Sequence, residues 1–299
     1  MGSPSQYTHR QYLRAKASVD AQSLHAGVWD AFTTHLNQIA SSQDTLTILE
    51  VGAGVGTTAQ WVLDAIHSLG AAVEVRYIAV DKHETAMAEA KDALKGWGKK
   101  HETEIKSSKN GIQVEGRKNS HIVQFISRDI FKYLEENEGL EADVVVAQAF
   151  FDLFNLEYIL DILACRAKHL LYFPINFDGV TGFTPEVGSI DDTVERAYHR
   201  SMERRETENG PIGGSKCGRR LLQCVIEADA LQLIEAGPSD WLIYPHNHEY
   251  TDSERYFIEY MLHTIEQELK SESEISSSEL HHWIEQRREH LQQGKLTFM

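Results

Sequence analysis

The chain has 299 residues, a formal net charge of −16 and 41% hydrophobic residues, a composition typical of a globular protein with a sizeable core. Because a surface this acidic repels phosphate backbones, we expect no nucleic-acid partner. No apolar run is long enough to cross a bilayer, so we expect no membrane partner. The three cysteines lack metal-ligand spacing, and residues 1–10 lack the apolar segment of a signal peptide, which favours a reducing, cytoplasmic location.

The first 40 residues predict a helical arm ahead of the folded core. Within residues 7–40, apolar side chains recur at intervals of three to four, the spacing of one helix face. That face holds Leu24, Val28, Phe32, Leu36 and Ile39. We therefore predict an N-terminal arm over residues 1–40 and a core over residues 41–245.

A glycine-rich turn follows the first predicted strand. Residues 46–51 form an apolar run, and glycines then occupy alternate positions at Gly52, Gly54 and Gly56 before an apolar-periodic segment begins at Thr57. This order predicts a buried strand, a tight turn and the start of a helix. Glycine accepts backbone angles closed to other residues, and it lets the main chain contact a ligand. In an open parallel sheet, ligands bind at the carboxyl ends of the strands, where this turn lies.

The spacing of these glycines separates two kinds of nucleotide site. The dinucleotide fingerprint needs a third glycine where the chain has Thr57, which disfavours a nicotinamide dehydrogenase. Glu50 closes the first strand, and the second predicted strand, residues 73–80, is followed by Asp81. At these residues the chain resembles the class I S-adenosylmethionine-dependent methyltransferases. In that family a strand ending in an acid precedes a Gly-x-Gly-x-Gly loop, and the second strand also ends in an acid.

Strands and helices alternate between residues 46 and 175. The predicted strands are 46–51, 73–80, 121–127, 143–149 and 169–175. This alternation predicts an α/β fold with a Rossmann-like, doubly wound, mostly parallel sheet. The resemblance implies seven strands, with an antiparallel last strand inserted beside the fifth. Residues 231–236 are a further predicted strand, and residues 296–299 are expected to begin the last one in a natural protein that continues beyond Met299.

Two stretches outside this alternation predict helical cap segments. Residues 176–215 form an insertion in which loops rich in glycine and proline flank a helix. Residues 246–299 hold two predicted helices, 252–270 and 278–293, and the start of the final strand. These long segments resemble those of bacterial metabolite methyltransferases.

The resemblance also implies which residues contact the cofactor, S-adenosyl-L-methionine. The glycine loop would pack against its methionine part, Asp81 would accept hydrogen bonds from the ribose hydroxyls, and the third strand would end at the adenine. The residues assigned in this way are Glu50, Gly52, Ala53, Gly54, Gly56, Thr57, Asp81, Lys82, Asp129, Ile130, Gln148 and Ala149. For Asp129, helix capping is an open alternative. A basic residue of the arm, Arg14 or Lys16, is a candidate partner for the cofactor carboxylate.

Methyl transfer to a hydroxyl group needs a base, and the sequence offers three candidates. Asp152 follows the fourth strand, Asp178 follows the fifth, and His199 lies on the cap helix. Asn176 and Tyr198 are the expected substrate-binding residues beside them. Loop aspartates often serve turns and helix histidines often face solvent, so the choice among the three stays open.

Two clusters are not expected to be functional sites. His246 and His248 stand one residue apart but lack a third ligand, so no metal is predicted. The basic linker between Lys95 and Lys118 is interpreted as a solvated insertion with a short hairpin near residues 112–114.

We therefore predict a methyltransferase that acts on a small-molecule substrate, with oxygen as the expected acceptor atom. One alternative is methyl transfer to protein or RNA, which only the basic linker favours. Another is a non-catalytic subunit that binds S-adenosylmethionine and needs a partner chain. The sequence does not identify the acceptor or the oligomeric state, for which a homodimer is one option.

Overall fold

The computed structural model describes residues 7–69, 73–108, 111–115, 120–270 and 272–299. Its centre is a seven-stranded sheet with the strand order β3-β4-β5-β2-β1-β6-β7. Five strands run parallel to one another: β1 Thr45–Val51, β2 Glu74–Asp81, β5 Ser120–Ser127, β6 Ala142–Val146 and β7 Ala167–Tyr172. The other two, β3 Glu104–Ser108 and β4 Gly111–Glu115, form an antiparallel hairpin beyond β5. The predicted doubly wound, mostly parallel, seven-stranded sheet is confirmed.

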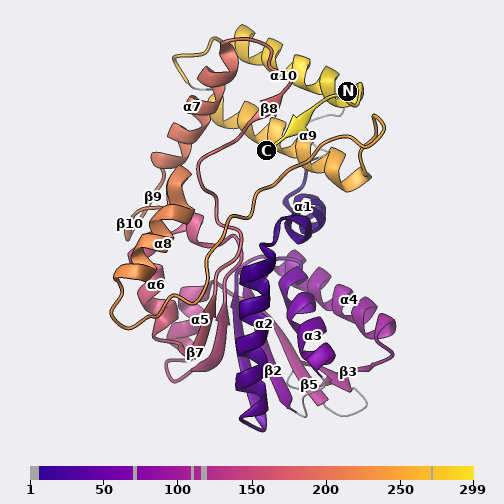
Figure 1. The fold of residues 1–299 in the computed structure, drawn as a ribbon, viewed down its shortest axis with the longest axis vertical. Helices are drawn as coiled ribbons and strands as arrows, with labels where there is room; N and C mark the ends of the chain where they lie inside the picture. Colours follow the sequence, from indigo (N-terminus) through magenta and orange to yellow (C-terminus); the bar gives the residue numbers. More distant parts are fainter. Residues whose placement is uncertain (1–6, 70–72, 109–110, 116–119, 271) are drawn as a thin grey trace.

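Helices cover both faces of this sheet because its central strands are apolar on both sides (Figure 1). In β1, Leu46 and Ile48 join the buried cluster on one face, whereas Leu49 and Val51 join the cluster on the other. The first face is covered by α2 Ala26–Ser41, α3 Thr57–Leu69 and α4 Glu84–Lys100. The second is covered by α5 Ile130–Glu136, α6 Leu156–Ala164 and α8 Cys217–Glu227.

A separate group of helices forms the cap, which lies above the sheet in the view of Figure 1. Its helices are α1 His9–Ser23, α7 Ile190–Glu203, α9 Asp252–Leu269 and α10 Ser277–Gln292. They share one cluster of buried apolar side chains, which includes Phe257 and Trp283. Both α9 and α10 begin with a capping box, Thr251 with Glu254 and Ser276 with Glu279, which satisfies the free backbone N–H groups of the first turn.

The predicted N-terminal arm is helical, but it is two helices that pack against different parts of the molecule. The first helix, α1, is capped at Leu24, and α2 begins two residues later. On α1, Ala15 and Val19 are buried in the cap cluster, while on α2, Phe32 and Leu36 are buried against the sheet. The arm therefore connects cap and core.

The expectation of an antiparallel last strand beside the fifth parallel strand is wrong. The two antiparallel strands of the sheet, β3 and β4, lie at its opposite edge. The chain end forms β11 Thr297–Phe298, which pairs with β8 Phe183–Thr184 in a two-stranded sheet of its own. Phe298 is 2% exposed, in the cap cluster with Phe183 and Phe257, so burial of this aromatic side chain accounts for the pairing.

The predicted strand at 231–236 is also wrong. The chain there joins α8 to the cap without regular secondary structure, and Leu233 and Ile234 are 42% and 47% exposed. An alternating apolar pattern specifies a strand only where another strand lies beside it to complete the hydrogen bonds. Shorter elements complete the connections: η2 Phe151–Leu153, β9 Glu206–Thr207, β10 Gly210–Pro211 and η3 Gly214–Lys216.

The hairpin predicted near residues 112–114 is confirmed as β3 and β4, and it extends the sheet. Ile112 and Val114 are its buried side chains. The basic residues Lys109, Arg117 and Lys118 of the same linker lie outside the described residues.

Candidate active site

The order in which the chain adds strands to the sheet reverses between β1 and β6. From β1 the chain continues to β2 on one side, whereas β6 and β7 lie on the other, so the loops after β1 and β6 diverge and leave a crevice. A cavity of about 2160 Å³ opens there between the sheet and the cap. Most of the predicted site residues line it: Gly52, Ala53, Gly54, Thr57, Asp81, Lys82, Asp129, Ile130, Gln148, Ala149, Asp152, Asn176, Asp178 and Tyr198. Glu50, Gly56 and His199 do not line it.

The glycine loop has the backbone that its sequence requires. Gly52, Gly54 and Gly56 have φ angles of +68°, +52° and +78°, in the left-handed region that side chains disfavour. A Cβ at Gly52 would come within 2.5 Å of Phe150, and one at Gly56 within 2.8 Å of Ala90. At Gly54 a Cβ would meet only the Leu13 side chain, at 3.6 Å, so bare main chain faces the cavity there. Glycine is thus required at positions 52 and 56 because neighbouring side chains pack against them. At position 54 it leaves the main chain open to a ligand in the cavity.

Asp81 closes β2 and holds the glycine loop. One of its oxygens accepts the backbone N–H of Gly54 at 2.9 Å, and the other accepts that of His83 at 2.8 Å. A carboxylate has about four acceptor positions, so two of these bonds leave room for a ligand's hydroxyl groups. The side chain also lines the cavity, one strand away from the loop.

The residues proposed for the adenine end lie together at the start of α5. Ile130 is 6% exposed, and Asp129 precedes it at the carboxyl end of β5. One oxygen of Asp129 accepts the backbone N–H groups of Phe131 and Lys132, at 3.1 and 3.3 Å, so the alternative role as a helix cap is present in the structure. Lys82 is exposed at the rim of the cavity.

Glu50 is buried at the carboxyl end of β1, just before the loop. It is 1% exposed, and its carboxylate accepts a hydrogen bond of 2.9 Å from the Tyr77 hydroxyl of β2. Burial raises the pKa of Glu50 to about 8, because the charged form loses its hydration. Its hydrogen bond ties the end of β1 to β2, and its side chain does not line the cavity.

The end of β6 carries backbone strain. Ala149 has a φ angle of +47°, and Ile175, at the end of β7, has one of +56°. Such angles cost non-glycine residues of order 1–3 kcal/mol and are concentrated at functional sites. The backbone N–H of Ala149 donates to the carbonyl of Pro174 at 3.0 Å, which ties the two strand ends together.

Asp152 is the candidate base that best matches the chemistry. It lies in η2, directly after β6, and its Oδ1 is buried without a hydrogen-bond partner. Burial raises its pKa to about 6, against the opposing attraction of Lys16 and Arg205. A half-buried carboxylate that lines a cavity and has a pKa raised toward neutrality is suited to accept a proton.

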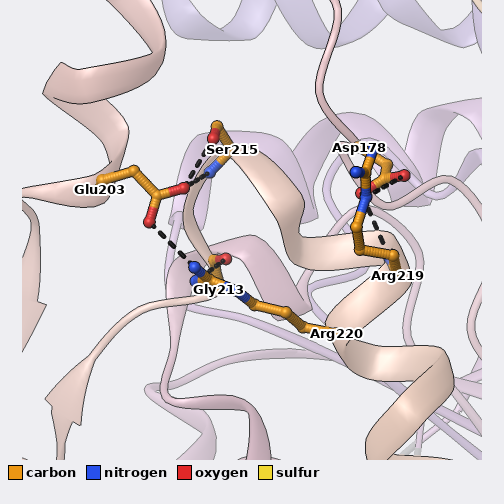
Figure 2. A network of polar contacts seen from close by, with 6 residues as sticks. All are labelled: Asp178, Glu203, Gly213, Ser215, Arg219 and Arg220. Carbon is orange, nitrogen blue, oxygen red and sulfur yellow. Dashed lines mark hydrogen bonds and ion pairs between the residues drawn. The ribbon is translucent and has the colours of Figure 1, made fainter.

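Asp178 has a different environment. Both of its oxygens lie within 3.0 Å of the Arg219 guanidinium, and one also accepts the Arg219 backbone N–H at the start of α8 (Figure 2). Beside this pair, Glu203 of α7 accepts hydrogen bonds from Ser215 and Arg220. These contacts anchor α8 to α7 and to the loop after β7, so they supply a structural role for Asp178.

The other predicted residues lie on the loop after β7 and on α7. Asn176 donates to the carbonyl of Phe173 at 2.9 Å, while its Oδ1 is buried without a partner. Tyr198 is 5% exposed, and burial raises its pKa to about 12. His199 lies 3.3 Å from the Thr181 hydroxyl, outside the lining of the cavity, and burial lowers its pKa.

Among the lining residues that the sequence did not indicate are three with polar groups: Asp20 of α1, Tyr260 of α9, and Trp241, which precedes α9. Asp20 and Tyr260 lie on helices whose pattern indicates only an amphipathic face, and Trp241 lies between elements. No local signal could have identified them, because their shared position arises from the packing of the cap. Lys16, a candidate from the sequence, does line the cavity, whereas Arg14 is exposed and pairs with Glu89 of α4.

Comparison with known proteins identifies the family. The model of a family described as "Putative S-adenosyl-L-methionine-dependent methyltransferase" matches residues 30–299. The chain belongs to this family of methyltransferases. Its cofactor is S-adenosyl-L-methionine, and the cradle fits that molecule: bare main chain at Gly54, an accessible carboxylate at Asp81 and an apolar contact at Ile130.

The methyltransferase matches no curated protein, but it is similar to several solved structures. One is the plantazolicin methyltransferase BpumL in complex with SAH, with 16% identity and a TM-score of 0.34 over 55% of this chain and 52% of that one. Another is cofactor-bound Rv0187 from MTB, with 14% identity and a TM-score of 0.34 over 74% and 80% of the two chains. The match to BpumL thus spans about half of its length.

The described residues include neither a helix that could span a membrane nor a cluster of side chains that could hold a metal ion. None of the helices in the described part of the chain combines the length and apolar character that a bilayer span requires. Within the same residues, no group of three or more metal-ligating side chains has a suitable arrangement, and this includes His246 and His248.

Proposed function

We propose that this methyltransferase transfers the methyl group to a hydroxyl oxygen of a small, largely apolar acceptor. The acceptor would lie in the part of the cavity between Asp152 and the cap. The observation that carries the proposal is the carboxylate of Asp152, which lines the cavity and whose Oδ1 is buried without a hydrogen-bond partner. The following observations support each part of it.

The size of the cavity supports a small acceptor bound beside the cofactor. Sites for small ligands usually enclose about 300–1,000 Å³, and this cavity measures about 2160 Å³. The space therefore accommodates a second molecule, and both the sheet and the cap contribute side chains to it.

The character of the walls supports an apolar acceptor. Among the large hydrophobic residues that are well exposed, Leu153, Val180, Leu222 and Met299 all line this cavity. The exposed fractions of the first two are 49% and 57%. An apolar ligand would remove this surface from water, at about 25 cal/mol per Å². On the cap side, Tyr198 and Tyr260 add aromatic surface.

The charges in the cavity support a role for Asp152 in proton transfer. The charges of Lys16 and Arg205 act to lower the pKa of Asp152, but each cation already has an ion-pair partner. Lys16 pairs with Asp20, and Arg205 pairs with Glu268. Asp152 itself has no such partner. When bound, S-adenosylmethionine supplies an activated methyl group that moves from sulfur to the acceptor oxygen as the carbon–sulfur bond breaks. Asp152 accepts the proton that the acceptor hydroxyl loses, and the cap excludes water.

The proposal is tested with Asp152→Asn, which keeps the shape of the side chain but removes its basicity. A panel of apolar phenols, alcohols and amines is first screened with S-adenosylmethionine, and the S-adenosylhomocysteine that methyl transfer releases is detected by mass spectrometry. With the acceptor so found, we expect kcat to fall by about 10²–10⁴-fold, while affinity for S-adenosylhomocysteine changes by less than about threefold.

The pH profile and a matched variant complete the test. Because the carboxylate is the active form and its pKa is raised to about 6, kcat/KM of the wild type should rise up to pH 6 and level off above it. Asp178→Asn removes the rival carboxylate and should retain most activity. If Asp178→Asn loses activity and Asp152→Asn does not, the base is misassigned; if only amines are methylated, the acceptor class is wrong.

A further inference from the structure

Asp20 of α1 is a buried carboxylate at the meeting point of α1, the sheet edge and the cap. It is 2% exposed. One oxygen accepts the side-chain N–H of Gln148, after β6, at 2.7 Å, and the other accepts the indole N–H of Trp241 at 2.9 Å. The same carboxylate forms an ion pair with Lys16, one helical turn earlier. Groups from three parts of the molecule therefore converge on one side chain.

The contacts continue from Asp20 into the cofactor cradle. Gln148 uses its carbonyl oxygen to accept a hydrogen bond of 2.5 Å from the Thr58 hydroxyl, in the first turn of α3. Thr58 follows the glycine loop directly, and both residues line the cavity. The hydrogen bonds thus run without a break from the loop, through Gln148 and Asp20, to Trp241 on the cap side.

The helix that carries Asp20 lies between the two halves of the cavity. On the cofactor side, Leu13 is the side chain nearest to where a Cβ of Gly54 would stand. On the cap side, Tyr12 stacks on Tyr260 with a distance of 4.2 Å between ring centroids. Figure 1 shows α1 between the sheet and the helices α9 and α10. Any movement of α1 would therefore change both halves together.

We propose that Asp20 is a positioning residue that couples cofactor binding to closure of the acceptor half of the cavity. With the carboxylate in place, α1 is held against Gln148 and Trp241, so Leu13 covers the cofactor cradle while Tyr12 completes the cap wall. Binding of the cofactor stabilises this docked arrangement, so the acceptor binds to a pocket whose walls are already in place. The inference rests on cofactor binding, and it does not depend on the acceptor chemistry proposed above.

Replacement of the carboxylate leaves buried donors without an acceptor. Three donors face it: the Lys16 ammonium, the Gln148 amide and the Trp241 indole. In Asp20→Asn one oxygen becomes an NH₂ group, which is itself a donor, and the ammonium loses its counter-charge in a site that is nearly closed to water. Relief requires α1 to move away from the sheet edge and the cap.

The first test compares Asp20→Asn with Asp30→Asn, a matched change at an exposed position of α2. S-adenosylhomocysteine is titrated calorimetrically into the full chain, and folding is checked by circular dichroism. We expect Asp20→Asn to bind at least tenfold more weakly, and Asp30→Asn to bind as the wild type does.

The second test measures coupling directly by amide hydrogen exchange with and without S-adenosylhomocysteine. In the wild type, the ligand should slow exchange in α1 and also around residues 241–243, which have no predicted contact with the cofactor. Trp241→Phe removes only the link to the cap, so α1 should remain protected while residues 241–243 no longer respond.

The outcomes separate this inference from the proposed function. Wild-type affinity in folded Asp20→Asn, or an unchanged exchange rate in both segments of the liganded wild type, would overturn it. Loss of the exchange response at residues 241–243 in Trp241→Phe, with α1 still protected by the ligand, would support it without any measurement of methyl transfer. A wild type that does not bind S-adenosylhomocysteine would instead refute the cofactor cradle itself.

Discussion

The two walls of the cavity are built in different ways. The wall on the sheet side consists of loops that follow consecutive strands, with Gly52, Gly54 and Asp81 within 30 residues of one another in the sequence. The wall on the cap side brings together Tyr12, Tyr198 and Tyr260 from three helices that are far apart in the sequence. The first wall depends on backbone geometry, and the second depends on side chains placed by packing.

This difference explains how one fold can serve several acceptors. A cofactor that is the same in every family member is held by main chain and strand ends, which the sheet fixes. An acceptor is met by cap side chains, which can change without disturbing the sheet. Substitutions in the two walls should therefore affect cofactor binding very differently.

The largest effect on cofactor binding is expected from Gly54→Val. A β-branched residue at a φ angle of +52° is strained, and its side chain would occupy the space that bare main chain leaves open. We expect affinity for S-adenosylhomocysteine to fall by about 100-fold or more. Gly139→Val is the control, because a Cβ there meets no atom within 4 Å. Tight binding by a folded Gly54→Val would mean that the ligand does not approach this loop.

A smaller effect is expected from Asp81→Ala. This change removes an acceptor at the end of β2 and also the hydrogen bonds to Gly54 and His83 that hold the loop. We expect a loss of about 1.5–3 kcal/mol, or roughly 10- to 150-fold in affinity, by calorimetry. Asp229→Ala removes the same charge at an exposed position that does not line the cavity, and affinity for the cofactor should not change. An unaltered affinity in Asp81→Ala would show that the ribose is held elsewhere.

The smallest effect on cofactor binding is expected from Tyr198→Phe, on the cap wall. The ring remains buried, so stability should be kept, and the hydroxyl does not belong to the cofactor cradle. Affinity for S-adenosylhomocysteine should stay within about threefold, or 0.7 kcal/mol, while KM for the acceptor rises. A large loss of cofactor affinity would erase the distinction between the two walls.

Much of the sheet wall could be predicted, because its signals are local. Alternate glycines after an apolar run indicate a tight turn, and an acid at the end of the next strand lies beside that turn in any parallel sheet. Residues 50–57 therefore predicted the loop, and Asp81 was placed one strand away. Even so, Glu50 proved to be buried behind the loop, since sequence does not show which way a side chain at a strand end points.

The chain end and residues 231–236 show where such signals fail. An alternating apolar pattern states that one face of a segment will be buried, but it does not name the partner. Phe298 is buried in the cap cluster beside Phe183, and its strand pairs with β8 instead of joining the main sheet. Residues 231–236 form no strand in the structure, and the side chains of Leu233 and Ile234 remain exposed.

The amino-acid sequence by itself determined the parallel core and the backbone of the cofactor loop, because both follow from short-range periodicity and from what glycine alone permits. Only the tertiary structure decided that α1 separates from α2 at Leu24, that Asp20 meets Gln148 and Trp241, and that Oδ1 of Asp152 is buried without a partner. These properties depend on contacts between residues distant in the chain, and burial, which sets the pKa of Asp152, exists only after those contacts have formed.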